Sequence, residues 1–220
     1  MATLEEPVER TYGKTRIQAI NEVRILDAAQ EVFAEHGFRG ATVDEIAARA
    51  EMSKPNLLYY FKNKRVLYRA VLDRTLVIWL EPLKELDAAN DPESEIRNYI
   101  TRKLEASRRH PNASRVFAGE IQQGAPVLMD YLRGDLRDLV KRKVLVIEQW
   151  IAEGKLAPID PVHLLFMIWA TTQHYADFAV QVRAVMNRKS LKKKDFETID
   201  DAVSTIFLRG ILPRDGNQSG

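Results

Sequence analysis

Apolar residues recur at intervals of three and four along almost the whole chain, which is the period of an amphipathic α-helix. No stretch alternates apolar and polar residues as a half-buried strand does, so we expect an all-α protein. Glycine, proline and polar residues divide the pattern into helices. The expected helices cover 17–36, two short segments within 42–61, 64–87, 93–109, 112–122, 127–153, 161–181 and 195–211. Pro82 predicts a kink or local break near Ile78, and Gly134 could divide the helix over 127–153.

The stretch from Thr42 to Phe61 has the pattern of two short helices joined by a tight turn. Thr42 and Ser53 can each cap a helix, and Pro55 lies in the first turn after Ser53, where its missing N–H removes no hydrogen bond. The second helix buries its leucines and leaves four residues on or near its outer side: Lys54, Asn56, Tyr59 and Tyr60. This pattern indicates a helix-turn-helix whose second helix enters a DNA major groove, although any αα-hairpin of a helical protein has the same pattern.

The net charge of the 220 residues is only +2, but its distribution is informative. Residues 52–74 contain six basic residues and one acidic residue, a cluster that suits a phosphate backbone or, alternatively, a solvated helix face. The chain has no Cys, which excludes disulfides, thiolate metal sites and a cysteine nucleophile. It also lacks the apolar run of a signal peptide and any 18-residue apolar stretch, so we expect a cytoplasmic protein with no membrane partner.

The pattern predicts four parts. They are a disordered arm over 1–16, a helix-turn-helix DNA-binding domain over 17–63, a helical ligand-binding and dimerisation domain over 64–212, and a disordered tail over 213–220. Lys14 and Arg16 could reach a minor groove from the arm, or they belong to a solvated tail. The helix over 64–87 begins with basic residues and ends with apolar ones, so it would contact DNA at one end and a second core at the other.

Residues 25–72 closely resemble the DNA-binding segment of TetR-family transcriptional regulators. The shared features are Gly37-Phe38, Gly40, Thr42, Ser53 and the run Tyr59-Tyr60-Phe61, each at the spacing typical of the family. Glu51 stands where the family usually has Gly, so it must accept an uncommon backbone conformation or a slightly altered turn. The resemblance implies a homodimer on a pseudo-palindromic operator, with recognition helices about 34 Å apart.

The resemblance also implies which residues contact DNA. Thr42 would hold a phosphate, Lys54, Pro55 and Asn56 would approach base edges, and two tyrosines and a lysine would contact the backbone. From the residues alone, Tyr59 could instead pack in a core, and Lys54 could be solvated. The expected DNA-binding set is Lys14, Thr42, Ser53, Lys54, Pro55, Asn56, Tyr59, Tyr60 and Lys64.

Residues 124–136 and 154–182 resemble one branch of the family, the uracil-responsive regulators of pyrimidine utilisation. Trp169 and Gln173 are four residues apart and share a helix face. An indole beside a carboxamide suits a flat heterocycle with an amide edge. The other candidate ligand-binding residues are Trp79 as an opposite wall, Phe117, Glu120 and Phe178. Alternatively, both tryptophans are core residues, Gln173 bonds across a dimer interface, and His174 pairs with Asp177.

We interpret the chain as a ligand-responsive repressor of nucleobase metabolism, without cofactor, metal or catalytic residues. Uracil is the expected effector. Ala118 and Gly119 stand where bulkier apolar residues are expected in that branch, which makes a purine or another pyrimidine the alternative. The last two long helices would form the dimer by burying Phe166, Ile168, Ile206 and Phe207. An enzyme of pyrimidine breakdown using His174 and Asp177 is a second interpretation, and a ligand-free helical scaffold is a third.

Overall fold

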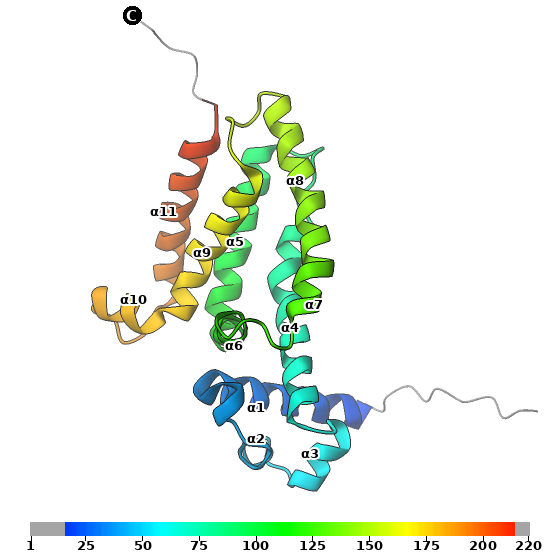
Figure 1. The fold of residues 1–220 in the computed structure, drawn as a ribbon. Helices are drawn as coiled ribbons and strands as arrows, with labels where there is room; N and C mark the ends of the chain where they lie inside the picture. Colours follow the sequence, from blue (N-terminus) through cyan, green and yellow to red (C-terminus); the bar gives the residue numbers. More distant parts are fainter. Residues whose placement is uncertain (1–15, 214–220) are drawn as a thin grey trace, which may run out of the picture.

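The computed structural model describes residues 16–213, which form helices with no β-strand among them, as the all-α prediction requires. Figure 1 shows a small helical unit at one end, from which α4 leads into a larger bundle. The helices are α1 (Arg16–Gly40), α2 (Val43–Arg49), α3 (Lys54–Tyr60), α4 (Lys64–Lys84), α5 (Pro92–Arg109), α6 (Pro111–Gln122), α7 (Met129–Tyr131), the π-helix η1 (Leu132–Leu136), α8 (Arg137–Ala152), α9 (Pro161–Asp177), α10 (Ala179–Val185) and α11 (Lys193–Ile211).

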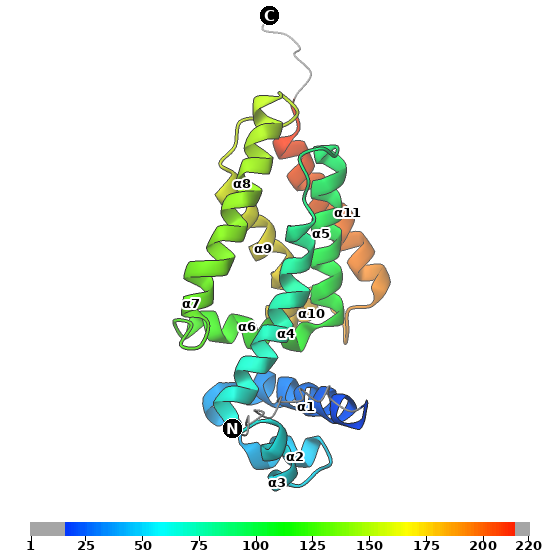
Figure 2. The same ribbon diagram turned by 90° about the vertical axis from the view of Figure 1, so that its right-hand side faces the viewer.

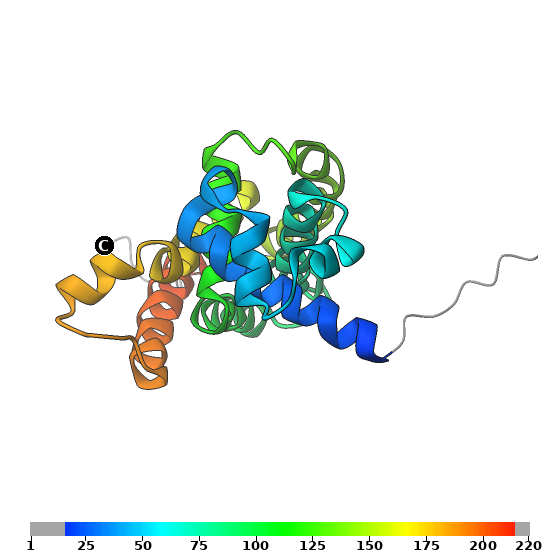
Figure 3. The same cartoon turned by 90° about the horizontal axis from the view of Figure 1, so that it is seen from below.

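The small unit consists of α1, α2 and α3, seen from below in Figure 3. The predicted caps are confirmed: Thr42 Oγ1 accepts a hydrogen bond from the Glu45 N–H at 3.2 Å, and Ser53 Oγ accepts one from the Asn56 N–H at 3.3 Å. Gly37 has φ 66° and interrupts α1 where its end was predicted, before one further turn. Glu51 has φ 50°, so the uncommon conformation expected at this departure from the family pattern is present.

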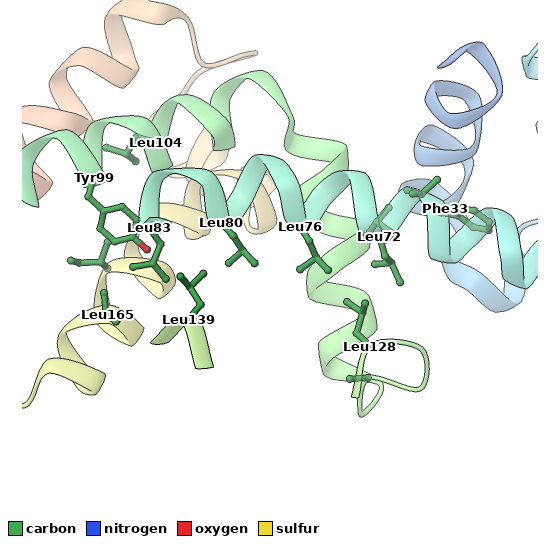
Figure 4. Packing of buried hydrophobic residues seen from close by; sticks show 14 of the residues in the cluster. Phe33, Leu72, Leu76, Leu80, Leu83, Tyr99, Leu104, Leu128, Leu139 and Leu165 are labelled. Carbon is green, nitrogen blue, oxygen red and sulfur yellow. The ribbon is translucent and has the colours of Figure 1, made fainter. Parts of the chain in front are cut away.

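Helix α4 links the small unit to the bundle and contributes to the core of both. Figure 4 shows four of its leucines along one side: Leu72, Leu76, Leu80 and Leu83. They belong to one apolar cluster that extends from Ile25 in α1 to Ile211 in α11. The two ends of the molecule therefore share a continuous core. Figure 2 shows α4 running from the small unit into the bundle.

Three predicted helices differ from those observed. Helix α4 continues without a break across Ile78. Pro82 lies in its last turn, and the helix ends two residues later at Lys84, so the hydrogen bond that proline cannot donate is lost only at the end of the helix. The helix expected over 127–153 is not divided at Gly134, which instead lies in the π-helical turn η1. The helix expected over 161–181 ends at Asp177, and after Phe178 the chain turns into α10, which projects from the bundle beside α11 (Figure 1).

The predicted dimer residues divide into two groups. Ile168 is 1% exposed within the chain itself, so the expectation that it forms an interface between copies is wrong. Phe207 is 8% exposed and lines a groove between α9 and α11. Phe166 and Ile206 are 48% and 73% exposed and lie on the outer faces of α9 and α11. None of the described helices is long and apolar enough to cross a membrane.

Candidate functional site

Helix α3 presents a polar outer surface at the free end of the molecule. Thr42, Ser53, Lys54, Pro55 and Asn56 are all exposed around its beginning and that of α2. Tyr59 is 73% exposed, so the alternative that it packs in the core is excluded. Leu57 of this helix is fully buried, and Leu58 and Tyr60 are half-buried against the same core. These three residues hold α3 against the unit. Lys14 lies outside the described residues.

Tyr60 and Lys64 are held by contacts within the protein. The Asn21 side-chain amide donates a hydrogen bond to Tyr60 Oη at 2.9 Å. Lys64 Nζ donates to the Ala41 carbonyl at 2.9 Å and lies 4.7 Å from the centre of the Phe38 ring. The lysine that was expected to hold a phosphate therefore also fixes the connection between α1 and α2.

Lys54, the first residue of α3, forms an exposed ion pair with Asp44 of α2 at 2.9 Å. The contact could not be predicted from the sequence. Asp44 lies in the first turn of α2, where an acidic residue is favoured by the helix N-terminus, so its presence there did not indicate a partner. An approaching phosphate must compete with the Asp44 carboxylate for the Lys54 ammonium. Asp44 is thus a residue of the candidate DNA interface that the sequence analysis missed.

Half of the basic cluster over 52–74 faces away from α3. Arg65 donates a hydrogen bond to the Pro126 carbonyl at 3.3 Å, Arg69 pairs with Asp73, and Arg74 pairs with Asp27. The cluster therefore serves the contact between the small unit and the bundle as much as any nucleic acid. Lys62 remains exposed beside α3.

Within the bundle, Trp79 of α4 is only 3% exposed, and its Nε1–H has no hydrogen-bond acceptor among the described residues. The ammonium of Lys103 in α5 lies 5.1 Å from the centre of its ring. Lys103 is 2% exposed and forms no ion pair or hydrogen bond with a described residue. Burial lowers the pKa of Lys103 from 10.5 to about 7, and the charge of Asp177 opposes this shift.

Sequence analysis missed Lys103, although a signal existed. It lies three residues after Ile100 and seven after Ile96, in the apolar row that α5 turns toward the core. A lysine in such a row either is buried with the apolar residues or prevents α5 from packing against the core. Buried charges without a partner are costly and are therefore often functional.

Polar side chains from α5, α6 and α9 lie close to this pair. Ser114 Oγ donates a hydrogen bond to the Asp177 carboxylate at 2.5 Å, and Ser107 Oγ donates to the Thr172 carbonyl at 2.9 Å. Burial raises the pKa of Asp177, while Ser114 and then Lys103 act in the opposite direction. Asp177 thus bonds to α6, and the local pair with His174 that was left as an alternative is not formed.

Trp169 and Gln173 are both half-buried on one side of α9. Trp169 Nε1 donates a hydrogen bond to Tyr99 Oη on α5 at 2.5 Å. The Gln173 carboxamide forms no hydrogen bond with any described residue, so its donor and acceptor are both available. Phe117 of α6 packs half-buried against the apolar core.

Glu120 and Phe178 do not occupy the places expected of ligand-binding residues. Glu120 is buried, but its Oε1 accepts hydrogen bonds from the Val127 and Leu128 N–H groups, at 2.6 and 3.0 Å. Its carboxylate therefore holds the segment that follows α6. Phe178 is half exposed, and its ring stacks on His174 with centroids 5.0 Å apart.

One other group of acidic and histidine side chains converges among the described residues. Glu35, His36 and Glu45 place their ligand atoms within 4.8 Å of one another. The Arg49 guanidinium lies 2.8 Å from the Glu35 carboxylate and lowers its pKa. Because an arginine already neutralises this exposed cluster, its geometry is explained without an ion.

Residues 25–71 match the family described as "Bacterial regulatory proteins, tetR family", and residues 72–214 match the region described as "YcdC-like protein, C-terminal region". The chain therefore belongs to the TetR family and is a DNA-binding transcriptional regulator, not an enzyme.

Among its relatives is the HTH-type transcriptional regulator RutR of Escherichia coli strain K12, to which it is 47% identical over 207 residues, covering 94% of this chain and 98% of RutR. The HTH-type transcriptional repressor SCO4008 of Streptomyces coelicolor is 26% identical over 169 residues, covering 75% of this chain and 82% of SCO4008.

Solved structures show the same fold at lower identity. The ketosteroid transcriptional regulator KstR2 of Mycobacterium tuberculosis superposes with a TM-score of 0.70 at 20% identity, over 93% of this chain and all of that one. AibR, solved in complex with isovaleryl coenzyme A and operator DNA, gives a TM-score of 0.62 at 17% identity, over 84% of this chain and 97% of that one.

Proposed function

We propose that the protein is a homodimeric repressor of nucleobase metabolism that acts in the cytoplasm. Its affinity for a pseudo-palindromic operator is controlled by a planar nitrogen heterocycle, and uracil is the first candidate. The resemblance of residues 124–136 and 154–182 to the uracil-responsive branch supports the choice of ligand class.

The observation that carries the effector site is a buried donor without an acceptor among the described residues, the Trp79 Nε1–H. Beside it lies the ammonium of the buried Lys103, which faces the Trp79 ring and forms no hydrogen bond with a described residue. A buried donor left unpaired costs about 1–3 kcal/mol, and more when it is charged. Uracil brings two carbonyl oxygens that accept such bonds and two N–H groups that donate. The free carboxamide of Gln173 suits an O=C–N–H edge, and the indole of Trp169 offers an apolar face.

The exposed faces of α9 and α11 support the homodimer. Met167 and Ile206 are large apolar side chains at the surface of these two helices, 56% and 73% exposed. A groove of about 520 Å³ between these helices is lined by Met167, Thr171 and Ile206, among others. Pairing this face with its copy would remove the apolar groups from water in a four-helix arrangement.

Helix α6 supports a route from effector to operator. Its Ser114 bonds to Asp177 beside the candidate effector residues, and α6 packs on α1 of the DNA-binding unit (Figures 1 and 2). At its other end, Glu120 holds Val127 and Leu128. Arg65 and Arg69 of α4 donate to carbonyls of the same segment. A ligand that moves Asp177 would therefore displace α6 against α1 and α4. For this displacement to control the operator, the ligand has to bind more tightly to the displaced arrangement of α6 than to the original one.

Thermal unfolding with uracil, thymine, cytosine, xanthine and dihydrouracil tests the effector. A ligand at 100 times its Kd adds about 2.7 kcal/mol of stability. We expect a selective shift with uracil that is reduced in Trp79→Phe, which keeps a ring but removes the N–H, and is unchanged in the control Phe178→Ala. A shift with xanthine alone would move the proposal to a purine. No shift with any base would refute the effector assignment and leave the regulator standing.

The operator and the dimer require separate measurements. A duplex selected from a random library should contain a pseudo-palindrome, and fluorescence anisotropy should show that uracil weakens its binding. Sedimentation should give a dimer at micromolar concentration and a monomer for Ile206→Glu. The control Val77→Glu, at a site on α4 that is 60% exposed against 73% for Ile206, should stay a dimer. A selected site without symmetry, or a monomeric native protein, would contradict this part of the proposal.

A further inference from the structure

A groove of about 690 Å³ lies between η1–α8 and the first half of α9. This volume is within the range of small-molecule sites, about 300–1,000 Å³. The groove shares Trp169 with the candidate effector residues, but Trp79, Lys103 and Gln173 do not line it. Its apolar lining consists of Leu132, Leu136, Val140, Val144, Leu145, Val162, Phe166 and Trp169.

The sequence of η1–α8 builds one wall of the groove with an apolar row that packs against the core on one side and stays half-buried on the other. Helix α8 turns Leu139, Ile147 and Trp150 into the core. The groove is lined by a second row at 132, 136, 140 and 144, spaced by four residues and only half-buried. This row extends for about 18 Å at a rise of 1.5 Å per residue. The groove is therefore long enough for an extended acyl chain.

A row of positive charge follows the same wall. Arg133, Arg137 and Lys141 are spaced by four residues and line the groove, which contains one acidic residue, Glu148. Arg133 and Arg137 form no ion pair with any described residue, and Lys141 makes only a 3.6 Å contact with Asp138. An apolar trough beside unpaired guanidinium groups is complementary to an anion that carries a long apolar tail.

We propose that this groove binds a fatty carboxylate, with its acyl chain along the apolar row and its carboxylate on Arg133 or Arg137. An acyl chain can cover the apolar row along its whole length, which a small planar base cannot do. Trp169 lines the groove and bonds to Tyr99 on α5, so an occupant touches a residue of the candidate effector site. The chain would then respond to two chemical classes, and this second site does not depend on the nucleobase assignment.

Calorimetric titration of the full chain with saturated fatty acids of 8 to 16 carbons tests the proposal. Each added methylene should tighten binding roughly fourfold until the groove is filled, because burying one is worth about 0.8 kcal/mol. Methyl esters of the same acids should bind at least tenfold more weakly, since they lack the charge. Affinity that is independent of chain length, or equal for acid and ester, would overturn the proposal.

Matched variants locate the site. Arg133→Gln and Arg137→Gln should each weaken binding several-fold, while Arg142→Gln, an exposed arginine of α8 outside the groove, should not. Val140→Trp should fill the groove and abolish binding. The uracil-induced thermal shift should persist in all four variants, which separates this site from the effector site. The assignment would be overturned if Arg133→Gln and Arg137→Gln both bound as tightly as Arg142→Gln, or if Val140→Trp left binding unchanged.

Discussion

Replacing Lys103 by methionine removes a buried ammonium but keeps an unbranched side chain of similar length. The native pKa of Lys103 is about 7, against 10.5 for an ordinary lysine. Between these values the unfolded chain binds more protons than the folded one, so the stability of the native protein rises with pH. The linkage gives a gain of about 2 kcal/mol between pH 7 and pH 9, which is part of a total near 5 kcal/mol.

Urea unfolding of the native protein and of Lys103→Met at pH 7, 8 and 9 measures this gain directly. The methionine variant should be the more stable protein at pH 7, and the difference should shrink by about 2 kcal/mol by pH 9. Other groups titrate in both proteins and cancel in the comparison. A difference that is constant with pH would refute the argument, because it would mean that Lys103 keeps an ordinary pKa in the folded protein.

The same shift makes effector binding depend on protons. A carbonyl oxygen placed at the Lys103 ammonium favours the charged form, so the ligand should raise the pKa and the protein should take up a proton on binding at pH 8. Calorimetry in two buffers of different ionisation enthalpy measures the uptake. Lys103→Met should show none, and its residual affinity would report the remaining contacts.

Three further predictions concern the DNA-binding unit and its connection to the bundle. Asp44→Asn should release Lys54, raise non-specific DNA affinity several-fold and steepen its salt dependence by up to about one unit, whereas Glu153→Gln should leave both unchanged in filter-binding assays. Glu51→Gly should relieve the positive φ and stabilise the protein by roughly 1 kcal/mol. Glu51→Ala loses the same exposed ion pair with Arg24 but keeps a side chain at the positive φ, so it should not be stabilised. Equal melting temperatures of the two variants would show that the backbone is not strained at this position. Glu120→Gln should cost about 1–2 kcal/mol in urea unfolding, because the Val127 and Leu128 N–H groups lose a charged acceptor. It should also reduce effector-induced release of the operator more than it reduces effector binding. Unchanged release would show that Glu120 does not connect the effector site to the DNA-binding unit.

The helix-turn-helix could be predicted from sequence because its signals are local. Thr42 and Ser53 each cap a helix through an N–H three residues away, and Pro55 fixes the first turn of α3. The bonds that occupy Tyr60 and Lys64 connect them to residues 39 and 23 positions away, Asn21 and Ala41. Helical spacing predicts contacts only between residues three or four positions apart. The sequence therefore does not distinguish the exposed Tyr59 from Tyr60, which is hydrogen-bonded within the protein.

The effector region shows the same limit. The shared face of Trp169 and Gln173 follows from helical periodicity, but the hydrogen bond of Trp169 to Tyr99 depends on how α9 packs on α5. The contacts of Glu120 could not be predicted from sequence, because its partners, Val127 and Leu128, meet it only when the segment after α6 folds back. Lys103 could have been found, since a charged residue in an apolar row is visible in the sequence alone.

The continuous core through α4 has a consequence for building chimeric regulators. The two halves of the family pattern meet between residues 71 and 72, inside α4 and next to the buried pair Val71 and Leu72. If residues up to 71 were fused at that point to the ligand-binding domain of another regulator, the buried residues on the two sides of the junction would not be complementary. A transferable module has to carry α4 complete, together with the segment over 126–128 that Arg65 and Arg69 hold. New combinations of operator and signal are therefore easier to obtain by altering the exposed side chains of α3 than by exchanging domains.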